Sequence, residues 1–187
     1  PLALVPVLAL LGLLAMGSPS TWLTLTVAGL AMGMMIFIMA SGLTLVFGLM
    51  DVINFGHGAF VTVGAFVGFS VLAWLAGWTS DPSVLLNLSA VLVAILIAMA
   101  ATALLGYAFE RVIVKPVYGS HLKQILVTMG GLIIAQQLIY VVWGPDALHI
   151  SRPESLQGSF IFGNALIEKY RLLAVVVGIA LFLAMSY

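Results

Sequence analysis

Cysteine is absent from this chain of 187 residues, and charged residues make up only 6% of it. The lack of cysteine excludes disulfide bonds and thiolate metal sites within the chain. Soluble domains carry about 25% charged residues, so this composition argues against a soluble fold. Six basic residues balance six acidic ones, and the zero net charge gives no indication of nucleic-acid binding.

Motifs for catalysis and nucleotide binding are also missing from the sequence. It has no His-Glu-x-x-His zinc motif, no nucleophile elbow, no phosphate-binding loop with its lysine and no dinucleotide fingerprint. His57, His121 and His149 show no ligand spacing, so no metal site is expected. We therefore expect no catalytic residue and no bound cofactor in this chain. If ATP drives its activity, the ATPase must lie on another subunit.

Apolar residues make up 64% of the chain, and several runs approach the roughly 20 residues that span a bilayer. These runs predict an all-α fold, a polytopic membrane helix bundle with about six transmembrane helices. The helices are expected at about 2–16, 22–50, 59–77, 84–109, 124–143 and from 169 onwards, with a short hairpin considered near 159–164.

We expect residues 1–187 to form a single transmembrane domain with an extra leading helix at about 2–16. A signal peptide is the alternative for this first run, but it lacks a basic start and a clear cleavage site. The chain stops at Tyr187 inside an apolar run, so truncation at the C-terminus is expected. By the positive-inside rule, the basic 110–123 segment is expected in the cytoplasm and the 144–168 segment outside.

The run from Gly42 to Gly68 interrupts the apolar pattern with several glycines, an aspartate, an asparagine and a histidine. Polar or irregular backbone at membrane depth is stable only where protein buries it or where it lines a wet cavity. One helix over 22–50 would be about 43 Å long, which exceeds a hydrocarbon core of about 30 Å. Such a helix either tilts strongly or breaks near Ser41 and Gly42. The glycines favour the break and predict a broken or re-entrant segment at about 42–58.

The polar residues of this run are candidates for a transport pathway. Gly56 and Gly58 flank His57, which would let the chain turn sharply there. A helix that starts at His57 would direct free N–H groups at the break, where they attract a carboxylate such as that of an amino acid. The alternative is that Asn54 and His57 only satisfy broken backbone. Asp51 is either a pathway residue or, as its place near the cytoplasmic face favours, a helix cap.

Small and polar residues also line one face of the helix expected at 124–143. They are Gln124, Thr128, Gly131 and Ala135, with Gln136 and Gln137 beside them. Inward-facing amides in a membrane bundle usually bond to neighbouring helices, and contact with a substrate is the alternative.

Several short motifs keep the order and spacing of a known family. They are Gly42-Leu43-Thr44, Phe47-Gly48, Ile53-Asn54-Phe55-Gly56-His57-Gly58, Glu110-Arg111, Lys115-Pro116, Thr128-x-Gly130, Gln136-Gln137 and Trp143-Gly144. Over about residues 25–145 this set resembles the permease subunits of ABC-type branched-chain amino-acid importers. The related permeases of urea importers share much of the pattern and stay open as an alternative.

The resemblance implies a role and a set of partners. Such permeases move branched-chain or related amino acids across the bacterial inner membrane by alternating access. They pair with a second related permease, two cytoplasmic ATPase subunits that bind ATP, and an external (periplasmic) substrate-binding protein. In this chain the implied substrate pathway residues are Thr44, Asn54, His57, Gln136 and Gln137, and the helix-break glycines are Gly42, Gly48, Gly56 and Gly58. Many relatives have a small residue, often glycine, at the position of Asp51, which favours its capping role.

Two other classes of function stay open on the sequence alone. A passive channel for urea or another small solute would be expected to repeat its pore motif, and one such segment is found. A non-transporting structural subunit of a membrane complex would bury the same segment in a dry interior.

Overall fold

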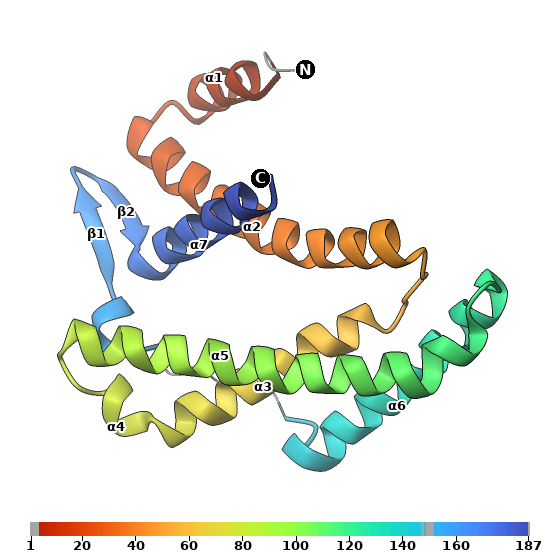
Figure 1. The fold of residues 1–187 in the computed structure, drawn as a ribbon. Helices are drawn as coiled ribbons and strands as arrows, with labels where there is room; N and C mark the ends of the chain where they lie inside the picture. The colour runs from red at the N-terminus through yellow and green to blue at the C-terminus, as the bar shows by residue number, and fades with distance from the viewer. Residues whose placement is uncertain (1–3, 147, 149–151, 187) are drawn as a thin grey trace. The chain divides into compact units, whose positions relative to one another are not determined.

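The computed structural model describes residues 4–146, 148 and 152–186. His149 and the first residues of the helix predicted at 2–16 lie outside the described residues. In chain order the elements are α1 (Leu4–Met16), α2 (Pro19–Met50), α3 (His57–Trp74), α4 (Ala76–Thr79), α5 (Val84–Phe109), the π-helix η1 (Glu110–Val114), the 3-10 turn η2 (Lys115–Val117), α6 (His121–Trp143), the 3-10 turn η3 (Glu154–Leu156), β1 (Ser159–Phe162), β2 (Ala165–Glu168) and α7 (Lys169–Ser186) (Figure 1). Over the described residues the fold is all-α apart from one hairpin, as predicted.

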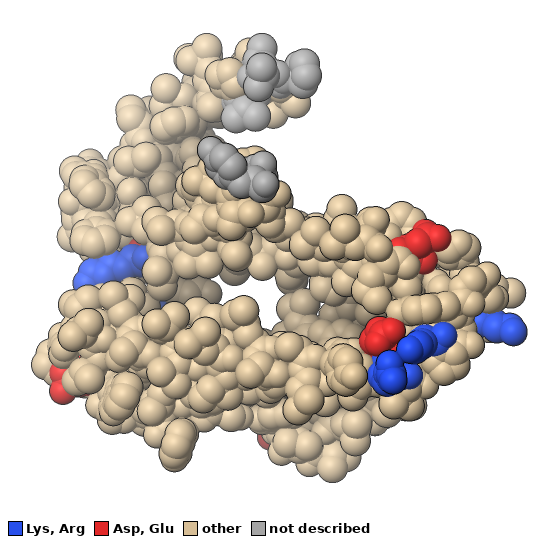
Figure 2. All heavy atoms as spheres, viewed as in Figure 1, with Lys and Arg blue, Asp and Glu red and all other residues tan. Residues whose placement is uncertain are grey.

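Long apolar helices dominate the described chain, which confirms a membrane helix bundle. Those long and apolar enough to cross a bilayer are Pro19–Met50, His57–Trp74, Val84–Val117 and His121–Trp143. Large apolar side chains such as Leu49, Trp74 and Val141 are about four-fifths exposed. Such exposure is unfavourable in water, whereas contact with lipid removes the unfavourable hydration of these side chains. Figure 2 shows the charged side chains in a few small groups, with uncharged surface over most of the face drawn.

The predicted break at Ser41 and Gly42 is wrong, because α2 continues without interruption to Met50. Gly42 and Gly48 therefore lie inside a helix and not at its break. A glycine within a helix costs only about 1 kcal/mol, so glycines alone do not end one. The interruption is confined to residues 51–56, between α2 and α3, within the wider 42–58 stretch that the sequence indicated.

The helical path also continues past Phe109, where a polar loop was expected from Glu110 onwards. A π-helix over Glu110–Val114 and a 3-10 turn over Lys115–Val117 extend α5 before the chain turns. The run ends at Val117, one residue after Pro116, which has no N–H to continue the α-helical hydrogen bonds.

The chain folds as two compact units, one of Pro1–Met39 with Leu156–Tyr187 and one of Ala40–Ser155. In the first unit, the indole N–H of Trp22 donates to the carbonyl of Ala9 over 2.9 Å and ties α2 to α1. The hairpin predicted near 159–164 is present as β1 and β2, with Phe162 paired to Ala165. Gly163, with φ 62°, begins its two-residue turn, as a type II′ turn requires.

The second unit is built on α3, which packs against α5 and α6 (Figure 1). Gly131 of α6 makes room for Phe109 of α5, since a Cβ there would lie 2.5 Å from the phenyl ring. The same ring packs edge-on against Phe60 of α3, with centroids 5.4 Å apart. These contacts bring α3, α5 and α6 together around the segment that precedes α3.

Candidate functional site

The segment between α2 and α3 begins with an unusual backbone conformation at Asp51. Its φ is 51°, the left-handed region that glycine adopts most readily. The Asp51 N–H donates to the carbonyl of Phe47 over 3.0 Å and closes the last turn of α2. This geometry is that of a residue at a helix C-terminus, so it supports the capping interpretation of Asp51.

Two side chains of α6 hold the backbone of this segment. The N–H of Ile53 donates to Oε1 of Gln124 over 3.3 Å, and the N–H of Phe55 donates to Oγ1 of Thr128 over 3.2 Å. Both α6 side chains are buried, Gln124 at 2% exposed and Thr128 at 0%. These two side chains therefore bond within the bundle and not to a substrate, although their partner is the connecting segment and not the neighbouring helix that was predicted.

Asn54 and Gly56 form a tight turn just before α3. The N–H of Gly56 donates to Oδ1 of Asn54 over 2.9 Å, and the N–H of His57 donates to the Asn54 carbonyl over 3.3 Å. A Cβ at Gly56 would lie 3.0 Å from Asn54 Oδ1 and 3.4 Å from the carbonyl oxygen of Thr128. Glycine is therefore needed here for close approach, which accounts for one of the glycines that the sequence assigned to the break.

His57, the first residue of α3, lies over Gly42 of α2. A Cβ at Gly42 would be 3.0 Å from Cε1 and 3.4 Å from Nε2 of the imidazole. The absence of a side chain at Gly42 thus allows the histidine ring to pack closely against α2. Gly58 follows in the first turn of α3 and is exposed, so the structure gives it no comparable role.

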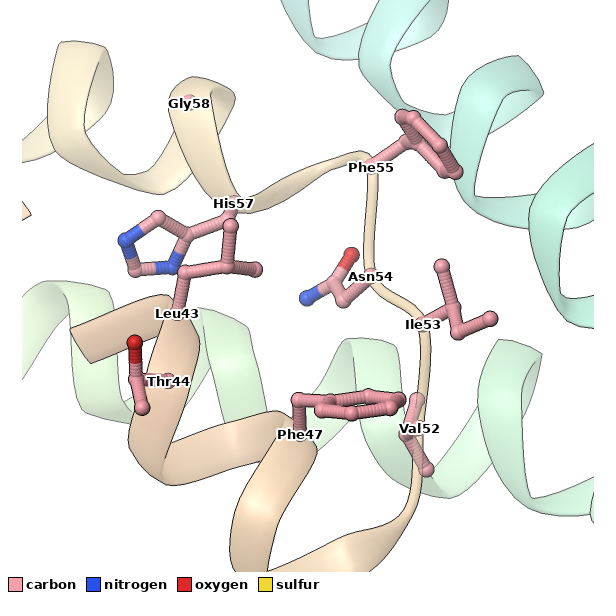
Figure 3. Close-up of a pocket in the computed structure, with 9 residues that line it drawn as sticks. All are labelled: Leu43, Thr44, Phe47, Val52, Ile53, Asn54, Phe55, His57 and Gly58. Carbon is pink, nitrogen blue, oxygen red and sulfur yellow. The ribbon is translucent and has the colours of Figure 1, made fainter. Parts of the chain in front are cut away.

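A cavity of about 560 Å³ opens where α2, the connecting segment and the start of α3 meet. Its lining comprises Leu43, Thr44, Phe47, Val52, Ile53, Asn54, Phe55, His57 and Gly58 (Figure 3). The lining is mainly apolar, and the Thr44 hydroxyl, the Asn54 amide and the His57 imidazole are its polar side chains. Apolar walls with a few placed polar groups are typical of sites for small organic ligands.

The structure brings three of the five predicted pathway residues to this cavity. Thr44 lies on α2, Asn54 on the segment and His57 at the start of α3 (Figure 3). Gln136 and Gln137 instead lie exposed in the second half of α6, and the described lining of the cavity includes neither. Their part in a pathway stays a prediction.

Sequence reasoning missed the apolar part of this lining. Leu43 and Phe47 are four residues apart on α2, the spacing that places two side chains on one helix face. That signal was present in the sequence but could not be separated from the apolar residues that face lipid. Val52, 3% exposed, was likewise hidden among the many valines of the chain.

Two polar contacts lie at the surface near the segment. Asp51 Oδ2 is 3.9 Å from Nε2 of His121, with both side chains more than half exposed. Tyr118, between η2 and α6, donates to Oε1 of Glu110 over 2.6 Å, and that hydrogen bond is the main cause of a raised tyrosine pKa. Among the described residues, no group of three or more histidine, aspartate or glutamate side chains could hold a metal ion.

Comparison with known proteins places the chain in a family. The family model described as "Branched-chain amino acid transport system / permease component" matches residues 25–187. The high-affinity branched-chain amino acid transport system permease protein BraD of Pseudomonas aeruginosa is 31% identical over 139 residues, which is 74% of this chain and 44% of that protein. The corresponding permease proteins LivH of Salmonella typhimurium and Escherichia coli are 31% and 30% identical over 137 residues, 73% of this chain and 43% of each relative.

The chain spans less than half the length of these curated relatives. No solved structure matches it. The region that the family model matches includes most of α2, the connecting segment and all the residues that line the cavity. The chain thus belongs to the family of permease components of branched-chain amino acid transport systems, the multi-pass membrane subunits of transporters.

Proposed function

We propose that the chain is a permease subunit of an ABC importer that moves branched-chain or related amino acids across the bacterial inner membrane. The observation that carries this proposal is the cavity lined by Thr44, Asn54 and His57 in a chain of this family. Its apolar walls suit an aliphatic side chain, and its few polar groups suit the charged or polar end of an amino acid.

The mechanism that follows is alternating access of a composite transporter. A second, related permease would complete the pathway, two cytoplasmic ATPases would bind and hydrolyse ATP, and an external binding protein would deliver the substrate. Motion of the paired permeases would expose the cavity to one side of the membrane and then to the other. This chain contributes the wall of the path and binds no ATP itself.

Uptake of radiolabelled leucine by cells that carry or lack the gene tests the proposal. We expect uptake to require the gene, the ATPase subunits and the binding protein, and excess isoleucine or valine to compete. Competition by urea with no effect of valine would support a urea permease instead. Uptake that persists after loss of the ATPase would support a passive channel.

Labelling with a water-soluble thiol reagent tests whether the cavity is wet. Because residues 1–187 contain no cysteine, Thr44→Cys, Asn54→Cys and His57→Cys each introduce a single thiol into this stretch. We expect all three to react. If none of the three reacts, with or without the ATPase, the cavity is not part of a transport pathway, and a structural subunit becomes the better account.

A further inference from the structure

Two cavities in the unit of residues 40–155 share one wall. The second cavity, of about 280 Å³, is lined by parts of α2, α3, α5 and η1 and reaches Glu110. Val52, Asn54 and His57 line both this cavity and the larger one described above. A direct passage between the two would therefore run past these three side chains.

The position of this shared wall is fixed from α6. The 51–56 segment lies between two helices, and its hydrogen bonds to Gln124 and Thr128 anchor it on either side of Asn54. Both anchors sit on one face of α6, four residues apart, with their side chains buried. A shift of α6 would therefore carry the Ile53 and Phe55 backbone with it, and the wall would move relative to α2.

The hydroxyl of Thr128 can bind α6 and the 51–56 segment at the same time. It donates to the Gln124 carbonyl over 2.7 Å, within α6, and its oxygen is left to accept the N–H of Phe55. Serine could make both bonds, whereas valine has nearly the same shape and can make neither. A partly buried N–H without a partner is costly, so the segment would have to move to find a new acceptor.

We propose that Gln124 and Thr128 are positioning residues of the transport pathway. They couple the position of α6 to the wall shared by the two cavities, and so determine whether Asn54 and His57 close or open the passage between them. The inference rests on the proposed transport function, and its structural part is measurable without transport.

Thiol labelling in native membranes, with all partner subunits present, measures the structural part. Thr44→Cys reports on the larger cavity and Met50→Cys on the smaller one. With either reporter cysteine we expect Thr128→Val to raise the labelling rate at least about threefold, because the wall loses its hydrogen bond to residue 128. Thr128→Ser should restore the original rate. The matched control is Thr62→Val, since the exposed Thr62 hydroxyl donates to the Gly58 carbonyl within α3 and, among the described residues, does not reach the 51–56 segment.

Leucine uptake measures the functional part. Thr128→Val is expected to lower Vmax about tenfold at equal amounts in the membrane while KM changes less than about twofold, with recovery in Thr128→Ser. Gln124→Met removes the other anchor and is expected to lower Vmax in the same way, which decides the question if Thr128→Val does not accumulate.

Unchanged labelling and unchanged Vmax in the valine and methionine variants would overturn the inference, as would equal damage from serine and valine. Wild-type membranes that take up no branched-chain amino acid would overturn the proposed function instead. In that case the labelling contrast still decides whether the two α6 side chains hold the wall.

Discussion

The two halves of α6 carry similar polar side chains in opposite surroundings. Gln124 and Thr128 in the first half are buried and accept hydrogen bonds from the backbone that precedes α3. Gln136 and Gln137 in the second half are exposed. The difference teaches that an amide in a membrane helix is structural where broken backbone lies opposite it, and available for other contacts where none does.

The largest effect is expected from removing a buried acceptor. Gln124→Met keeps the side-chain length but leaves the N–H of Ile53 unpaired, which should lower the free energy of unfolding by about 2 kcal/mol. Gln137→Met, on the exposed side, should change it by less than about 0.5 kcal/mol. Reversible unfolding in mixed detergent micelles measures both. Equal losses in the two variants would break the comparison.

A pair of glycines on α2 extends the comparison to another helix. A Cβ at Gly42 meets the His57 ring at 3.0 Å, whereas one at Gly48 has no described atom within 4 Å. Gly48→Ala should raise stability by up to about 1 kcal/mol through helix propensity. Gly42→Ala should have a free energy of unfolding about 1–3 kcal/mol lower than that of Gly48→Ala, because the imidazole must move.

Thermal unfolding of both variants alongside the wild type measures this gap. Identical midpoints would mean that the histidine ring moves away at no cost and that its packing does not require glycine at position 42. A restored midpoint in Gly42→Ala combined with His57→Ala would assign the loss to that one contact.

A smaller effect is expected where the segment leaves α2. Asp51→Gly should raise the free energy of unfolding by about 0.5–1 kcal/mol, because glycine adopts positive φ without strain and removes a carboxylate from the negative end of the helix. Asp51→Ala should lower it. Asp51→Asn separates the two causes, since asparagine tolerates the conformation and carries no charge. A lower stability for Asp51→Gly would show that the contact with His121 outweighs both.

The smallest effect lies at the exposed entrance to α6. The hydrogen bond to Glu110, followed by desolvation and by repulsion from the same carboxylate, raises the pKa of Tyr118. Glu110→Gln should therefore lower the pKa of Tyr118 toward its ordinary value. Ultraviolet absorbance titration, with Tyr118→Phe subtracted to remove the other tyrosines, measures the change. An unchanged titration would mean that the exposed hydrogen bond is lost to water.

The sequence predicted most of the helices because apolar length is a strong signal. α5 was expected at 84–109 and spans Val84–Phe109, and the hairpin near 159–164 is present. The polar face at Gln124 and Thr128 was also readable, because helical spacing places them together. The segment that these two side chains bind could not be predicted, because nothing in the sequence of α6 indicates which backbone lies opposite them.

The break near Gly42 was misplaced for a physical reason. Glycine serves both where a helix ends and where another side chain packs closely against a helix, and only the tertiary partner separates the two uses. At Gly42 that partner is His57. The true helix end is at Asp51, a residue type that gives a much weaker helix-ending signal than glycine does.

The positive φ of Asp51 also limits which mutations this position can accept. A single base change in an aspartate codon can give glycine, asparagine or histidine, which enter the left-handed region comparatively readily. It can also give alanine, valine, glutamate or tyrosine, which enter that region at greater cost. In a library of random point mutants selected for uptake, codon 51 should therefore retain the first group and lose the second, although its side chain lines neither cavity among the described residues.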